Sequence, residues 1–103
     1  LATIERAHEL GVPAVELHTG RYANSQRSEV ELEELATAAD HASGLGLAVH
    51  AGHGLTRDNV SPVAAIIPIE ELNIGHSIIA RSITIGIGPA TREIRRLMDG
   101  ARQ

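Results

Sequence analysis

Three short segments of this chain alternate apolar and polar residues, and this alternation is the strongest constraint on its fold. The segments cover residues 13–18, 46–51 and 71–75. A period of two places apolar side chains on one face of a strand and polar side chains on the other. Because stretches with helical periodicity separate the three segments, we predict parallel strands joined by helical crossovers.

The helices expected around these strands complete an α/β pattern. The clearest one covers residues 28–43, where Ser28 and Glu31 form the S-x-x-E pattern of a capping box. The other helices are expected at residues 3–10, 59–67 and 76–86, with a last helix opening at Pro89, and residues 19–27 are expected to form a polar loop. We therefore predict one partial domain, residues 1–103, in the order α-β-α-β-α-β-α-α.

The polar side of the predicted strands carries Glu16 and His18 in the first strand, His50 in the second and Asn73 in the third. A parallel sheet covered by helices on both faces would be apolar on both. In a (β/α)8 barrel, by contrast, the strands surround an interior with the active site at its C-terminal end. A complete barrel needs about 250 residues, so the remaining strands would come from a missing segment or from a partner.

Absent residue types narrow the chemistry. The sequence has no Cys and no Lys, which excludes disulfides, thiolate metal sites and Schiff-base or P-loop lysines within this chain. Tyr22 is the only aromatic residue and the net charge is −4, so nucleic acid is not an expected partner. No apolar run approaches the ~20 residues of a membrane span, and the start does not read as a signal peptide. The chain begins with Leu rather than Met, as a fragment would.

His53 is the first candidate for chemistry. It lies in A-G-H-G, directly after the second predicted strand, where barrel enzymes place catalytic groups. A histidine there can act as a general acid or base. The alternative is an ordinary loop histidine beside turn glycines.

Gly75 and His76 are the second candidate, because they follow the third strand and open a helix. Free N–H groups at a helix start, with a glycine that lets a ligand approach, can bind phosphate. The alternative is a simple turn between strand and helix.

Glu16 is the third candidate, as a charge partner for a cationic intermediate or a protonated histidine. A structural ion pair with an arginine is the alternative. His18, His50, His53 and His76 together raise a zinc hypothesis, which ranks below acid–base chemistry because i and i+3 on a strand point to opposite faces.

Taken together, three motifs resemble the pyridoxine 5′-phosphate synthase family. They are VELHTGRYA at 15–23, LGLAVHAGHGLTRDNV at 45–60 and ELNIGHSIIARSI at 71–83. The resemblance covers essentially the whole chain and implies the C-terminal portion of a TIM barrel, about strands six to eight with their helices. It also implies a cytoplasmic, homo-oligomeric transferase that uses neither metal nor cofactor.

The resemblance further implies a reaction and residue roles. Members condense 1-deoxy-D-xylulose 5-phosphate with 3-amino-2-oxopropyl phosphate to give pyridoxine 5′-phosphate, phosphate and water, in vitamin B6 biosynthesis. His53 would be the proton donor and Glu16 would stabilise transition-state charge. Gly54 would contact the aminoketone phosphate, and Gly75 with His76 would hold phosphate.

Two departures from the family qualify these roles. His50 stands where many members carry Asn. The general bases, a His and a Glu from the first half of the barrel, have no counterpart in this chain, so the isolated chain is expected to be inactive. Two other hypotheses remain: a non-catalytic half-barrel that binds phosphate compounds or self-associates, and another phosphate-binding TIM-barrel enzyme.

Overall fold

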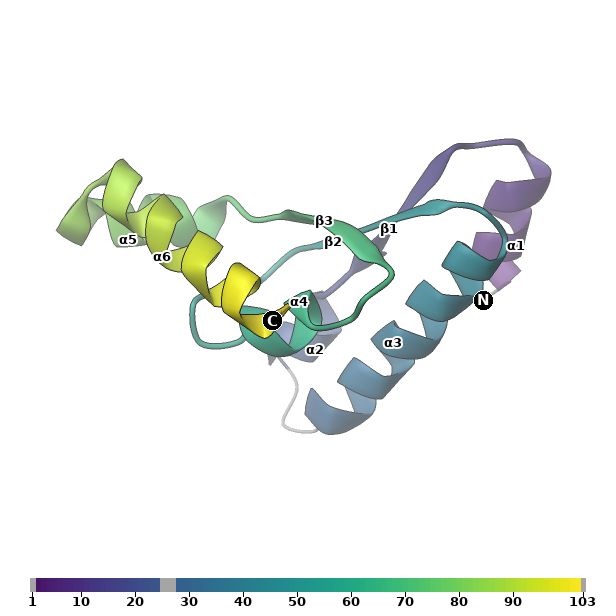
Figure 1. Ribbon diagram of the computed structural model, residues 1–103, viewed down its shortest axis with the longest axis horizontal. Coiled ribbons are helices and arrows are strands. Elements are labelled where there is room, and N and C mark those ends of the chain that lie inside the picture. Colours follow the sequence, from purple (N-terminus) through teal and green to yellow (C-terminus); the bar gives the residue numbers. More distant parts are fainter. Residues whose placement is uncertain (1, 25–27, 103) are drawn as a thin grey trace.

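The computed structural model describes residues 2–24 and 28–102, which form an elongated α/β unit (Figure 1). In chain order the elements are α1 (Ala2–Glu9), β1 (Ala14–His18), α2 (Gly20–Asn24), α3 (Ser28–Gly44), β2 (Ala48–Gly52), α4 (Val60–Ala64), β3 (Ile69–Asn73), α5 (His76–Ile85) and α6 (Ile87–Ala101). The α5–α6 pair lies at the end of the molecule opposite α1 (Figure 1).

The three strands form one parallel sheet in the order β1-β2-β3. Glu16 of β1 lies opposite His50 of β2, and His50 in turn lies opposite Glu71 of β3. A register shift between Val49 and His50 leaves Glu70 without a direct partner on β2. The polar residues of all three strands consequently share one face, as the alternation predicts.

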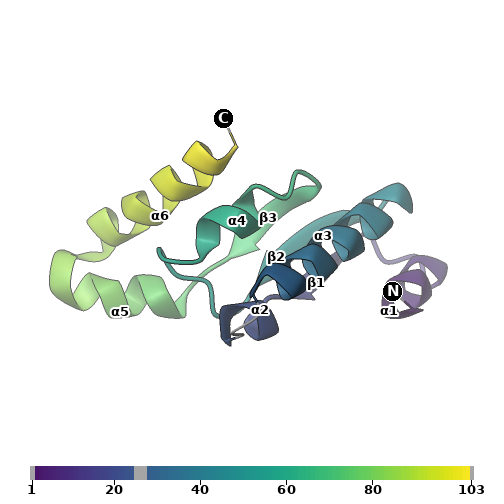
Figure 2. The same ribbon diagram turned by 90° about the horizontal axis from the view of Figure 1, so that it is seen from below.

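The apolar face of the sheet packs on helices, and the core lies between them. Val49 and Ile69 are each only 1% exposed. Ala39 and Ala42 of α3 are fully buried against this face, and Val63 of α4 joins the same cluster. Small alanines let α3 approach the sheet closely. Figures 1 and 2 show α3 and α4 on the same side of the sheet, and the opposite face carries no described helix.

Some predicted boundaries are wrong. The second strand covers 48–52 rather than 46–51, and the third covers 69–73 rather than 71–75. The third strand ends early because Gly75 becomes the residue that precedes helix α5. Helix α4 covers Val60–Ala64 instead of 59–67.

The N-terminal half of the predicted 19–27 loop is also helical. Residues 20–24 form α2, which buries Tyr22; residues 25–27 lie outside the described residues. The last helix starts at Ile87 rather than Pro89, because proline is tolerated within the first helical turn.

An arginine near the C-terminus ties α6 to the end of α4. The Arg102 guanidinium donates hydrogen bonds to the carbonyl oxygens of Ala64, Ile66, Ile67 and Ile69. The Ala64 carbonyl ends α4 and lacks a partner within the helix. The other three carbonyls belong to the turn after α4 and to the first residue of β3, so Arg102 fastens the end of α6 to this segment.

None of the helices in residues 2–24 and 28–102 combines the length and hydropathy needed to cross a bilayer. The small parallel sheet with its helices on one face is compatible with part of a TIM barrel.

Candidate active site

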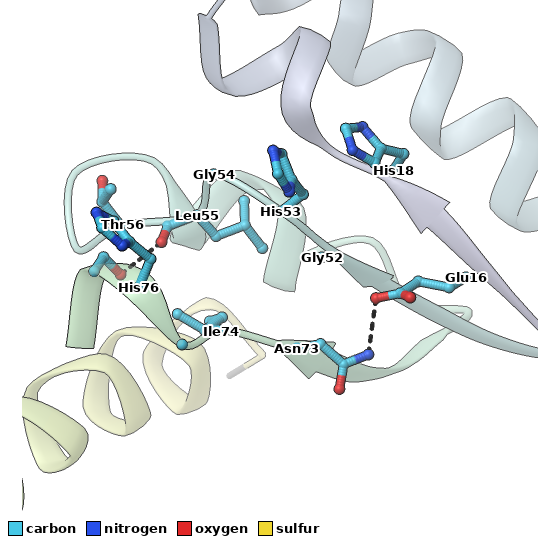
Figure 3. Close-up of a pocket in the computed structure, with 12 residues that line it drawn as sticks. Glu16, His18, Gly52, His53, Gly54, Leu55, Thr56, Asn73, Ile74 and His76 are labelled. Atoms are coloured by element: carbon cyan, nitrogen blue, oxygen red, sulfur yellow. Dashed lines mark hydrogen bonds between the residues drawn. The ribbon is translucent and has the colours of Figure 1, made fainter. Parts of the chain in front are cut away.

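A cavity of about 530 Å³ opens at the C-terminal ends of the three strands. All five residues proposed from the sequence line it: Glu16, His53, Gly54, Gly75 and His76. In Figure 3 the cavity is bordered by Glu16 of β1, by His53 and Gly54 of the loop after β2, and by His76 at the start of α5. The fold therefore brings together residues that lie up to 60 positions apart in the sequence.

His53 has an unusual backbone. Its φ angle is 100°, and among the described residues no other residue apart from glycines has a positive φ. Gly54 follows with a φ of 75°, so the chain turns sharply away from β2. The His53 side chain is exposed within the cavity. A non-glycine residue in this conformation is uncommon, and such strained residues cluster at functional sites.

His18 at the end of β1 stacks on His53, with ring centroids 4.4 Å apart and an angle of 27° between the ring planes (Figure 3). The backbone N–H of Gly20 donates to His18 Nδ1 at 3.2 Å. Because Nδ1 accepts this bond, the neutral His18 ring carries its proton on Nε2. The sequence reasoning considered His18 only as a zinc ligand and missed this contact. The sequence does carry a signal for this contact: H-T-G and A-G-H-G stand at the ends of two successive predicted strands.

Glu16 lies on the polar face of β1 and is exposed in the described chain. Its Oε1 accepts a hydrogen bond from Asn73 Nδ2 at 3.0 Å (Figure 3). This amide, rather than the arginine of the alternative hypothesis, is the partner that the described residues give Glu16. The carboxylate therefore spans β2 to reach β3, and Gly52 on β2 leaves room for it.

Gly75 and His76 stand at the start of α5. Gly75 is the N-cap residue, and the described residues place no side-chain cap on this helix start. Uncapped N–H groups carry the positive end of the helix dipole. Since Gly75 and His76 line the cavity with Gly54, these groups can bind an anion there.

The loop after β2 is held by several hydrogen bonds. Asn59 donates from Nδ2 to the Gly54 carbonyl at 3.2 Å and accepts at Oδ1 from the Thr56 N–H at 2.7 Å. The Tyr22 hydroxyl donates to the Asn59 carbonyl at 2.7 Å. Burial raises the pKa of Tyr22. Tyr22 packs beneath the loop and is absent from the cavity lining, so its part here is structural.

The histidines behind the zinc hypothesis do not converge on one point. His18 and His53 stack on each other, His50 lies 3.7 Å from Glu71, and His76 begins α5. Within residues 2–24 and 28–102, no three His, Asp or Glu side chains gather as a set of ligands.

Known proteins match this chain along nearly all of its length. The family model described as "Pyridoxal phosphate biosynthesis protein PdxJ" matches residues 1–100. Three similar proteins are named pyridoxine 5′-phosphate synthase. The one from Roseobacter denitrificans is 50% identical over 96% of this chain, the one from Thioalkalivibrio sulfidiphilus 49% over 100%, and the one from Magnetococcus marinus 50% over 95%.

This chain spans only 42–43% of the length of those relatives. The match nevertheless includes every residue that lines the cavity, from Glu16 to Ser77. On the family match and on identities near one half, the chain belongs to the PdxJ family of pyridoxal phosphate biosynthesis proteins.

Proposed function

We propose that this chain supplies the proton-donor and phosphate-binding part of a pyridoxine 5′-phosphate synthase, as about strands six to eight of a TIM barrel. The complete enzyme, a transferase, joins 1-deoxy-D-xylulose 5-phosphate to 3-amino-2-oxopropyl phosphate and releases pyridoxine 5′-phosphate, phosphate and water. The observation that carries this proposal is the cavity at the strand ends, which is lined by His53, Glu16 and the start of α5.

His53 is the proton donor in this proposal. Its imidazole is exposed to the cavity, and a histidine can hold or release a proton near neutral pH. General acid catalysis by a placed side chain contributes about 10²–10⁴-fold to a rate. The backbone conformation of residues 52–54 directs this ring into the cavity at the C-terminal ends of the strands.

The phosphate is bound between the start of α5 and the loop after β2. The α5 N-terminus offers N–H groups, and Gly54 brings the opposing backbone close because it has no side chain. Ser77 Oγ donates to the Leu55 carbonyl at 2.7 Å, which fixes these two walls against each other. Phosphorylated substrates are the partners that such a site fits.

Glu16 stabilises positive charge that develops on the condensing substrates. The Asn73 amide orients its carboxylate across the polar face of the sheet. This face lies open in the described chain, so the rest of a barrel would enclose it. Enclosure would strengthen the electrostatic effect of the carboxylate on a bound cation.

The rest of the proposed enzyme comes from outside this chain. Its relatives are more than twice as long, and the general bases of the family belong to the other part of the barrel. We therefore propose a cytoplasmic homo-oligomer in the full-length form, without metal or cofactor, and an inactive isolated chain. A non-catalytic phosphate-binding half-barrel is the second candidate, because the polar face that lies open in the described chain fits it as well.

The test places this chain inside a complete relative. In the Roseobacter denitrificans synthase, the segment that matches this chain is replaced by residues 1–103, and product formation from the two phosphorylated substrates is measured. The native relative is the positive control. We expect the chimera to turn over, and His53→Gln to lower kcat by about 100-fold or more with an unchanged circular dichroism spectrum.

Two outcomes would contradict the proposal. One is a folded chimera without activity beside an active native relative. The other is a His53→Gln chimera as fast as its parent. Phosphate binding by the isolated chain, followed by ³¹P NMR, would in those cases leave the half-barrel hypothesis in place.

A further inference from the structure

We propose that Thr19 is a positioning residue for His53: its hydroxyl and backbone N–H hold the Gly52–His53 segment in the conformation that sends the imidazole into the cavity. This inference rests on the proposed role of His53 as proton donor. Thr19 is not itself among the residues that line the cavity, so it would act through His53 and not on a substrate.

The contacts of Thr19 are the first argument. Thr19 follows β1 and is 0% exposed, although its side chain is polar. A buried hydroxyl without a partner is destabilising, so the hydrogen bond of the Thr19 hydroxyl is what allows its burial. Thr19 Oγ1 donates to the His53 carbonyl at 2.5 Å, and the Thr19 N–H donates to the Gly52 carbonyl at 2.9 Å. Thr19 thus donates hydrogen bonds to two consecutive carbonyl groups, those of Gly52 and His53, at the end of β2.

The backbone of His53 is the second argument. A φ of 100° is strained for a residue with a side chain, and such strain persists only where surrounding contacts impose it. If His53 relaxed to negative φ, its carbonyl would turn away and leave the Thr19 hydroxyl buried without a partner. The hydroxyl and the strained conformation therefore hold each other in place.

The ring of His53 has a matching support beside Thr19. The His18 ring stacks on it, and the Gly20 N–H fixes the His18 ring. A Cβ on Gly20 would lie 3.0 Å from His53 Cδ2 and 2.5 Å from His18 Cε1. The H-T-G motif at the end of β1 thus contacts His53 in two ways: Thr19 holds its backbone and His18 packs against its ring.

A purely structural role for Thr19 makes different predictions. If Thr19 only fills space, Thr19→Val should be nearly neutral, because valine has the same shape, and Thr19→Ser should be worse. If Thr19 positions His53, the order is reversed, because serine keeps the hydroxyl and valine removes it. These two variants therefore separate volume from hydrogen bonding.

The first measurement uses this chain itself and does not depend on activity. With ¹⁵N- and ¹³C-labelled histidine, NMR follows the His53 signals and the contact between the His18 and His53 rings. We expect Thr19→Val to shift the His53 backbone and ring signals and to abolish the ring contact, while the signals of His50, on the same sheet face, stay unchanged. Thr19→Ser should retain the wild-type signals. Unchanged His53 signals and an intact ring contact in Thr19→Val would overturn the proposal.

The second measurement is kinetic and uses the chimera described above. Thr19→Val should lower kcat about tenfold, the effect of one lost hydrogen bond, while KM for both substrates stays within about twofold. Thr19→Ser should restore kcat. Equal activity of the valine variant and the parent, or loss of activity in the serine variant alone, would overturn the proposal.

The outcomes also separate this proposal from the proposed function. An inactive parent chimera, or an active His53→Gln variant, refutes the proton-donor role, while the NMR comparison still decides whether Thr19 holds His53. If Thr19→Val does not fold, the pair Thr19→Ser and Thr19→Ala gives the same contrast. Both lose the methyl group, and only serine keeps the hydroxyl.

Discussion

The two faces of the three-stranded sheet differ in what they do, although they are built from alternate residues of the same strands. On the apolar face Val49 and Ile69 are almost completely buried against α3 and α4. On the polar face Glu16, His18 and Asn73 are exposed and border the cavity. Residues next to each other in the chain thus contribute separately to the core and to the cavity, and substitutions on the two faces should have separable effects.

The largest expected effect lies on the apolar face. Ile69→Ala should lower the free energy of unfolding by about 2–5 kcal/mol, because it removes a fully buried side chain and leaves a cavity in the core. Urea unfolding of the variant measures this loss. Ile67→Ala is the matched control: Ile67 is 70% exposed, and its truncation should cost less than about 0.5 kcal/mol. Equal losses in the two variants would remove the contrast between buried and exposed positions.

Gly52→Ala tests the limit of this comparison. Gly52 lies between polar side chains, and we nevertheless expect it to matter for folding. A Cβ at this position would lie 2.7 Å from the Asn73 carbonyl oxygen and 2.8 Å from Glu16 Oε1. We expect a loss of about 1–3 kcal/mol in unfolding free energy, since the backbone of β3 must move. Gly44→Ala is the control, because nothing lies within 4 Å of a Cβ at Gly44. A Gly52→Ala variant as stable as that control would show that the strands yield without strain.

Tyr22 contacts both the core and the loop that borders the cavity. Its ring packs in the core, and its hydroxyl holds the loop that follows β2. Burial raises its pKa above the ordinary value of 10.0. Below pH 10 the phenol is protonated in folded and unfolded chains, so its contribution to stability is fully present. As the pH rises past 10, the unfolded phenol ionises first, and the free energy of unfolding falls until the folded phenol also ionises.

Tyr22→Phe tests this pH dependence. The variant should lose about 1 kcal/mol at neutral pH, because the hydrogen bond to the Asn59 carbonyl is gone. It should also show a smaller decline in stability above pH 10 than the wild-type chain. Tyr22 is the only tyrosine, so phenolate absorbance reports its ionisation directly. Identical alkaline declines in both chains would mean that Tyr22 is not the group responsible.

The alternation along the strands predicted which residues share a face, and it did so despite wrong strand ends. Successive residues of a strand point to opposite faces, so the face of each side chain does not depend on where the strand begins or ends. The bulge at Glu70 could have reversed this result on β3. It did not, because the predicted segment 71–75 lies entirely beyond the bulge.

The supports of His53 could not be predicted from the sequence in the same way. Thr19 resembles a polar loop residue in sequence. Only the register of β1 and β2, which pairs His18 with Gly52, brings the Thr19 hydroxyl to the His53 carbonyl. Likewise, α2 was missed because Gly20 and Asn24 favour turns locally, whereas burial of Tyr22 favours the helix. Contacts between distant segments depend on register, which local patterns do not fix.

The last expected effect, similar in size to that of Tyr22→Phe, concerns His53 and has the opposite sign. His53→Gly should be more stable than His53→Ala by about 1 kcal/mol. Both variants lack the imidazole and its stacking on His18, but only glycine adopts a φ of 100° without strain. Their unfolding midpoints in urea, compared at equal m-values, give this difference directly.

That difference sharpens the contrast between the two faces. At Ile69 a smaller side chain removes stability, whereas at His53 removing the side chain altogether should return some of it. The strain is tolerated because the position serves the cavity, and glycine would relieve it only by giving up the proposed proton donor. If His53→Ala equals or exceeds His53→Gly in stability, the loop accommodates a side chain at φ 100° without cost. The conformation at His53 would then be explained without the Thr19 hydrogen bond as its restraint.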